Sequence, residues 1–202
     1  MCKRMSAVII LTLISLSSLA MAESLEMFVE NRSNSLLAEI DKGRENFAIT
    51  PEILYTKVGD SLNELVDFNT ITRGVMGSYY KGATAEQRTA FKQTFSTSII
   101  ETYTKALVVF KSKSIEVIPL AQQPDSKAIL SMKVTTQDGA VFMLTYNMVK
   151  NESRWRVRNI IVDGINLGLT YRNQFKAMMT EHHDDINAVI SHWRTTEPND
   201  NS

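Results

Sequence analysis

The chain has 202 residues, and its 22 Lys and Arg balance 22 Asp and Glu, so the formal net charge is zero. This balance disfavours nucleic-acid binding, which depends on many cations that neutralise phosphates. The single cysteine, Cys2, lies at the extreme N-terminus. One cysteine cannot form a disulfide within the chain, so the fold must rely on its core.

The first 22 residues have the layout of a secretory signal peptide. Lys3 and Arg4 form a basic start, and residues 8–19 are apolar apart from Thr and Ser. Ala20-Met21-Ala22 then provides small residues at the position that a signal peptidase reads. The apolar run is shorter than the roughly 20 residues that span a bilayer. We therefore expect residues 1–22 to be removed during export.

Cleavage before Glu23 would leave a chain of near-neutral charge. Removing two basic residues leaves 20 basic against 22 acidic side chains. Removing 22 residues from 202 leaves 180, which is enough for one domain with a substantial core. We expect this domain to span residues 23–195, followed by a disordered polar tail over residues 196–202.

Helical periodicity runs through the first half of the exported chain. Pro51 after Thr50 indicates a helix start, and Thr84 with Gln87 forms a capping box. Gly74 and Gly77 fall inside one predicted helix, where each costs about 1 kcal/mol relative to Ala, so this helix is a candidate hinge. Apolar residues three or four positions apart predict helices over residues 25–43, 51–65, 67–81 and 85–110.

The apolar period then changes to two, which indicates strands. Asp138-Gly139 is a tight hairpin signal, and Asp163-Gly164 ends the last strand, where we expect Asp163 to cap the helix that follows. Because the helices are segregated from an antiparallel meander, we predict an α+β fold. The predicted strands cover residues 114–120, 128–135, 142–148 and 155–162, and two further helices cover residues 167–178 and 186–193.

The search for catalytic chemistry is negative. The three histidines are His182, His183 and His192, and sequence neighbours on a helix diverge instead of converging on a metal. The sequence has no nucleophile elbow, no Gly-rich phosphate loop and no zinc-protease motif. We therefore predict no enzyme activity, no catalytic residue, no metal site and no cofactor.

Several segments, taken together and in order, are similar to the signature of one family. Two residues depart from the signature of that family: Asn159 and Asn166 stand where an Asp and a Ser are expected. The set resembles the MlaC-like family of periplasmic phospholipid-binding proteins, also called toluene-tolerance proteins, and the likeness covers nearly the whole exported chain. The segments are residues 66–71 (VDFNTI), 73–80 (RGVMGSYY), 83–88 (ATAEQR), 155–157 (WRV), 163–167 (DGINL) and 171–175 (YRNQF).

The resemblance implies a curved four-stranded antiparallel sheet packed against a helical layer, enclosing an apolar pocket. The pocket would hold the acyl chains of a diacyl phospholipid, and no cofactor is needed. It also implies a periplasmic monomer that carries lipid to maintain outer-membrane lipid asymmetry. The implied partners are an inner-membrane ABC transporter complex with its periplasmic lipid-binding subunit and an outer-membrane lipoprotein–porin complex.

On this resemblance, the lipid-binding residues are apolar and aromatic side chains on the inner faces of helices and strands. The helices supply Phe68, Ile71, Val75, Met76, Tyr79, Phe95, Ile99, Tyr103, Leu167 and Tyr171. The strands supply Leu130, Met132, Val134, Phe142, Leu144, Tyr146, Val157 and Ile161.

Two other classes of protein stay open. A cone-shaped enzyme or small-ligand binder of the nuclear-transport-factor type shares the general architecture, and a periplasmic lipoprotein carrier or chaperone would also need an apolar surface. An enzyme would place Asp, His or Tyr pairs inside its pocket, whereas the alternating strand positions here are mainly apolar.

Overall fold

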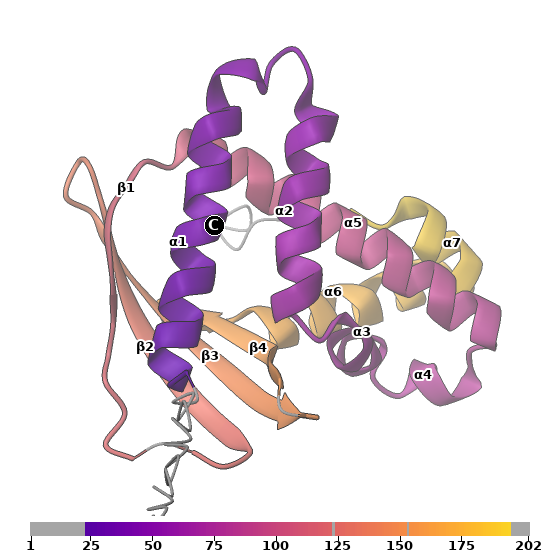
Figure 1. Ribbon diagram of the computed structural model, residues 1–202. Coiled ribbons are helices and arrows are strands. Elements are labelled where there is room, and N and C mark those ends of the chain that lie inside the picture. The colour runs from indigo at the N-terminus through magenta and orange to yellow at the C-terminus, as the bar shows by residue number, and fades with distance from the viewer. Residues whose placement is uncertain (1–22, 123, 153, 195–202) are drawn as a thin grey trace, which may run out of the picture.

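The computed structural model describes residues 23–122, 124–152 and 154–194. The predicted signal peptide and the predicted tail lie outside the described residues. Helices and one antiparallel sheet occupy separate parts of the molecule (Figure 1), which confirms the α+β prediction. Within the described part, no helix is both long and apolar enough to cross a membrane.

The sheet of the described chain has five strands, one more than predicted. Asp163 and Gly164 have positive φ angles of 47° and 84°, so the chain reverses tightly and pairs Ile165 with Val162. This reversal adds a two-residue strand. The strands are adjacent in chain order and antiparallel: β1 (Ser112–Val117), β2 (Lys127–Thr136), β3 (Val141–Asn151), β4 (Arg154–Val162) and β5 (Ile165–Asn166).

The helices form two groups (Figure 1). One is a hairpin that lies against the sheet: α1 (Leu25–Gly43), the 3₁₀ turn η1 (Arg44–Asn46) and α2 (Pro51–Leu65). The other lies on the side of β4: α3 (Phe68–Met76), α4 (Tyr79–Gly82), α6 (Leu167–Glu181) and α7 (Ile186–His192). The long α5 (Ala85–Val109) links the two groups, because it packs on α1 and α2 and also on α3 and α7.

Local capping chemistry explains where several helices begin. The capping box of α5 is present, because the Gln87 backbone N–H donates to the Thr84 hydroxyl at 3.2 Å and the Thr84 N–H donates to the Gln87 side chain at 3.0 Å. Pro51 is the first residue of α2, as predicted, but the Thr50 hydroxyl donates to the Asn46 carbonyl and does not cap the helix.

The single helix predicted over residues 67–81 is in fact two helices. Gly77 ends α3 with a φ of 56°, a conformation that side chains with a Cβ rarely adopt. Because Val75 and Tyr79 keep helical spacing across this break, the apolar pattern did not reveal it. The hinge hypothesis placed Gly77 inside a helix, and that premise is wrong.

An aromatic cluster forms the most tightly closed part of the core. The Phe91 ring centroid lies 4.7 Å from that of Phe175 and 5.1 Å from that of Trp193. Phe95 contacts Trp193 at 5.8 Å, so four rings from α5, from α6 and from the residue that follows α7 pack together. Each of the four is at most 1% exposed. A smaller cluster joins the helix hairpin through Ile40, Leu54 and Val58.

Candidate functional site

The inner face of the sheet carries an uninterrupted series of apolar residues. The antiparallel register pairs Leu130 with Tyr146, Met132 with Leu144, and Val134 with Phe142. Because side chains directly opposite each other lie on the same face, these six form one apolar surface. The register therefore agrees with the alternation read from the sequence.

A bulge in β4 changes which of its residues face inward. The pairing with β3 shifts at Asn147, so Ile160 lies opposite Tyr146 and Val162 lies opposite Leu144. Ile161 lies opposite Thr145, on the outer face of the sheet. The prediction that Ile161 faces the helices is therefore wrong, and Ile160 and Val162 take its place.

Part of this inner face is only half-buried. The following apolar side chains retain partial solvent exposure although they face or adjoin the core, and we call them the half-buried apolar face: Ile99, Tyr103, Phe110, Phe142, Leu144, Ile160 and Val162. Large apolar side chains left partly open in a cluster are typical of a ligand-binding surface.

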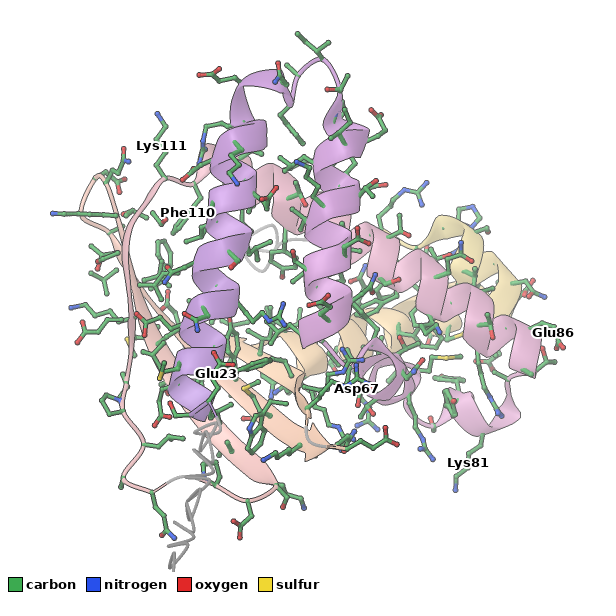
Figure 2. The ribbon with its side chains drawn as sticks, in the orientation of Figure 1. Glu23, Asp67, Lys81, Glu86, Phe110 and Lys111 are labelled. Carbon is green, nitrogen blue, oxygen red and sulfur yellow. The ribbon has the colours of Figure 1, made fainter. Side chains whose placement is uncertain are left out.

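Helix α5 and the residue that follows it contribute the part of the half-buried apolar face that does not come from the sheet. Phe110, at the junction of α5 and β1 (Figure 2), packs edge-on against Phe142 of β3 with ring centroids 5.7 Å apart. One helical turn after Ile99, the Tyr103 hydroxyl lies 2.6 Å from that of Tyr171. This hydrogen bond ties α5 to α6, so the phenol oxygens are paired and the rings present apolar surface.

The remaining predicted lipid-binding residues belong to the closed core or to its margin. Ile71 and Tyr79 are half-buried and pack against the core. The buried residues are Phe68, Val75, Met76, Phe95, Leu130, Met132, Val134, Tyr146, Val157, Leu167 and Tyr171. These side chains already contact protein, so they would meet a ligand only after the packing opens.

Sequence reasoning missed Phe110, Ile160 and Val162 as lining candidates. Phe110 continues the apolar stripe of α5 and was available from periodicity. Ile160 and Val162 have the wrong parity for a regular strand, because a bulge inserts one residue and moves the alternation to the other positions.

Polar side chains fix the end of the sheet to the start of α6. Asn166 caps the helix by accepting the Leu169 N–H at 3.1 Å, and Asn159 accepts the Gly168 N–H at 3.2 Å. Asp163 accepts the Met143 N–H at 2.7 Å. The expectation that Asp163 caps the helix is therefore wrong.

Asp67 fastens the start of α3 to β4. Its backbone N–H donates to the Val157 carbonyl at 2.9 Å, and its carboxylate lies 3.1 Å from the Arg158 guanidinium. Burial opposes ionisation of this carboxyl. However, hydrogen bonds from the Thr70 N–H and hydroxyl, together with Arg158, outweigh burial and hold the pKa of Asp67 below its usual range.

Two polar groups adjoin these apolar side chains: the Arg44 guanidinium donates to the Phe110 carbonyl at 3.3 Å, and Tyr146 lies on the inner face of the sheet. Burial raises the pKa of the Tyr146 phenol, so this group stays neutral at physiological pH. Among the residues that the structure describes, no three His, Cys, Asp or Glu side chains are placed to hold a metal ion.

Comparison with known sequences identifies the class of protein. The sequence model of the MlaC protein family matches residues 30–195. The chain belongs to the MlaC family, which confirms the resemblance stated above.

Two curated relatives are similar over most of their length. The toluene tolerance protein ttg2D of Pseudomonas putida is 31% identical over 166 residues, which cover 82% of this chain and 77% of that protein. The intermembrane phospholipid transport system binding protein MlaC of Haemophilus influenzae is 24% identical over 163 residues, covering 78% and 76% respectively.

A solved structure shares the fold. The phospholipid-binding protein from Ralstonia solanacearum, determined in complex with a phospholipid, aligns with a TM-score of 0.75 at 22% sequence identity. The alignment covers 84% of this chain and 94% of that one.

Proposed function

We propose that this protein is a periplasmic carrier of diacyl phospholipid that performs no covalent chemistry. The observation that carries the proposal is the half-buried apolar face, on which side chains from α5, β3 and β4 stay partly open beside a closed core. Membership in a family with a phospholipid transport protein among the curated relatives supports the same ligand class.

Elementary energetics explain why such a carrier is needed. Burying a methylene is worth roughly 0.8 kcal/mol, so two acyl chains with about 30 methylenes together would lose on the order of 20 kcal/mol in water. Unassisted diffusion between membranes is therefore negligible. A carrier only has to match the apolar environment of the bilayer, and lipid exchange can then proceed near equilibrium.

The two acyl chains are proposed to lie against the half-buried apolar face. The buried positions around it would become lining only as α5 or α3 moves away from the sheet. The predicted set of lining residues, with Ile160 and Val162 in place of Ile161, is the proposed contact surface.

The cellular setting is also part of the proposal. The signal-peptide pattern of residues 1–22 supports export, and the domain proposed for residues 23–195 nearly coincides with the match to the family at residues 30–195. We propose exchange with an inner-membrane ABC transporter complex and an outer-membrane lipoprotein–porin complex, which would help to keep phospholipid out of the outer leaflet.

Organic extraction of the gently purified protein, followed by mass spectrometry, tests the ligand class. We expect about one diacyl phospholipid per chain, with headgroups in the proportions of the host membrane, because the half-buried apolar face offers contacts to acyl chains and not to headgroups. Recovery of a polar small molecule and no lipid would instead favour the cone-shaped enzyme or small-ligand binder. Recovery of a single headgroup class would refute the lack of selectivity.

A further inference from the structure

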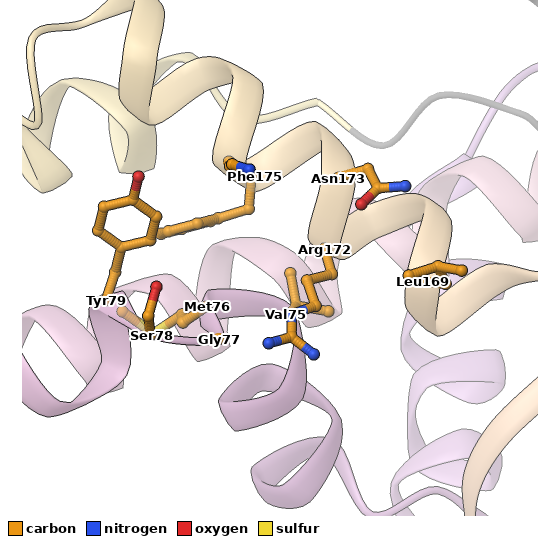
Figure 3. A pocket seen from close by; sticks show the side chains of 10 residues that line it. Val75, Met76, Gly77, Ser78, Tyr79, Leu169, Arg172, Asn173 and Phe175 are labelled. Carbon is orange, nitrogen blue, oxygen red and sulfur yellow. The ribbon is translucent and has the colours of Figure 1, made fainter.

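A recess of about 350 Å³ lies between the end of α3 and the middle of α6 (Figure 3). It is separate from the half-buried apolar face, and none of the seven residues of that face lines it. Its floor is formed by Val75, Met76 and Phe175, each at most 1% exposed. Its rim includes Gly77, Ser78, Tyr79, Leu169, Arg172 and Lys176, and we call this recess the cationic cleft.

The charge around the cationic cleft is one-sided. The sequence has no Asp or Glu from residue 68 to 85 or from residue 164 to 180, although the whole chain is charge-balanced. Among the residues that the structure describes, neither Arg172 nor Lys176 forms a side-chain hydrogen bond or an ion pair. Two adjacent cations without an internal counter-charge favour an external anion.

The local backbone holds Arg172 across the cleft. A Cβ at position 77 would lie 2.9 Å from the Arg172 Nε, so the guanidinium can lie against the end of α3 only because residue 77 is glycine. Figure 3 shows this side chain reaching from α6 toward Gly77.

The form of the site favours a protein as the source of the anion. A recess accepts a protruding side chain, whereas a flat lipid surface contacts residues that protrude from the protein. Leu169, one turn before Arg172 on the same face of α6, is 54% exposed and offers an apolar contact beside the charge. Arg beside an exposed apolar side chain is a common composition of interface hot spots.

We propose that the cationic cleft docks an acidic segment of a partner protein. A carboxylate of that segment is held by Arg172 and Lys176, and an apolar neighbour of the carboxylate packs on Leu169. The inference rests on the proposed function in one respect, since a carrier must dock in order to exchange its lipid. The cleft is then the docking surface, and the three residues that hold the partner, Leu169, Arg172 and Lys176, are not among the proposed lipid-contact residues.

Amide NMR titration of the purified exported protein tests this proposal. The probe is a peptide containing Leu-Glu-Glu-Leu, and its matched control contains Leu-Gln-Gln-Leu. We expect saturable shifts of the Gly77, Ser78 and Tyr79 amides with the acidic peptide at millimolar concentration, and none with the neutral peptide. The shifts should weaken as salt is added.

Three variants make the test specific. Arg172→Glu and Lys176→Glu should each weaken peptide binding by about tenfold or more, since each replaces an attraction by a repulsion. Lys133→Glu makes the same change of charge at an exposed position of strand β2 and should leave binding unchanged. Equal weakening by Lys133→Glu would overturn the proposal, because it would show that only the net charge matters.

Titration with other anions and measurement of the bound lipid complete the test. If glycerol phosphate or phosphatidylglycerol vesicles shift these amides more strongly than the peptide, the cleft contacts membranes and the proposal is wrong. Absence of any peptide shift also overturns it. Lipid content measured by mass spectrometry should be the same in all three variants, so loss of docking with retained lipid separates this inference from the proposed function.

Discussion

Helix α5 serves two regions of the molecule that differ in how completely they are closed. Its first half places Phe91 and Phe95 in the aromatic cluster, where they are at most 1% exposed. Its second half places Ile99 and Tyr103 on the half-buried apolar face. The same helical periodicity runs through both halves, so the sequence pattern is continuous although the packing is not.

Because the two regions differ in burial, we assign the stability of the fold to one and the proposed lipid binding to the other. Side chains in the aromatic cluster already bury their surface, so their contribution to folding is fully realised. Side chains on the half-buried apolar face still expose area, and each Å² removed from water by a ligand contributes about 25 cal/mol to binding. One region therefore holds the fold, and the other can still gain free energy from an acyl chain.

The sharpest test of this comparison is a pair of truncations in the lipid-free protein. Phe91→Ala should lower the free energy of unfolding by about 3–5 kcal/mol, because it leaves a cavity in closed packing. Leu144→Ala, on the half-buried apolar face, should cost about 1 kcal/mol, since less buried area is lost. Urea unfolding followed by circular dichroism measures both. Equal losses would show that the two regions are packed alike.

Neighbouring isoleucines on opposite faces of β4 test the proposed contact surface. Ile160→Asp should reduce bound phospholipid by about tenfold or more, because an ionised carboxylate is costly to place against acyl chains. Ile161→Asp is the matched control on the outer face and should retain lipid. Mass spectrometry of extracted lipid, with a thermal melt to confirm folding, gives the result. Loss of lipid in both variants would remove the distinction between the two faces.

The two glycines of the α3 region should respond in opposite directions to Ala. Gly77→Ala should destabilise by about 1–3 kcal/mol, since residue 77 has a φ of 56° and a new Cβ would crowd Arg172. Gly74→Ala lies within α3 with no atom within 4 Å of the new Cβ and should stabilise by about 0.5–1 kcal/mol. Melting temperatures decide, and a rise for Gly77→Ala would contradict the observed break.

The features of the fold that the sequence predicted correctly are those set by residues close together in the chain. The capping box at Thr84 and the start of α2 at Pro51 depend on adjacent residues and were correct. The alternation in β2 and β3 predicted their inner faces, because both strands are regular over those residues. The α+β fold followed from these elements.

The features that the sequence did not predict depend on backbone geometry and packing, which the spacing of apolar residues does not reveal. The bulge in β4 moves Ile160 inward and Ile161 outward without any change in composition. The positive φ of Gly77 ends α3 inside a continuous apolar pattern. Met132 and Leu144 are paired on the neighbouring strands β2 and β3, yet Met132 is buried and Leu144 is only partly buried. This difference depends on which parts of the chain cover each side chain.

A further small effect concerns Asp67, which attaches α3 to β4. Its folded-state pKa is lowered from the ordinary value of 3.8, so its stabilising contribution is complete well above that value. The contribution is lost as the pH falls through the lower folded-state pKa, where the carboxylate takes up a proton. Asp67→Ala removes both the cap on Thr70 and the ion pair with Arg158, and should cost about 1 kcal/mol at pH 7.

The pH dependence of stability tests whether the charge of the Asp67 carboxylate stabilises the junction of α3 and β4. Asp67→Asn keeps a capping oxygen but no charge, so it should cost less than Asp67→Ala at pH 7 and nearly match the wild-type chain once Asp67 is protonated. Ser24→Ala, which removes an uncharged cap from α1, should cost the same at both pH values. Urea unfolding at pH 7 and at a pH far enough below 3.8 to protonate Asp67 in the folded state provides the comparison. A difference between wild type and Asp67→Asn that persists unchanged at low pH would mean that shape and not charge stabilises this junction, because a protonated carboxyl no longer forms an ion pair with Arg158.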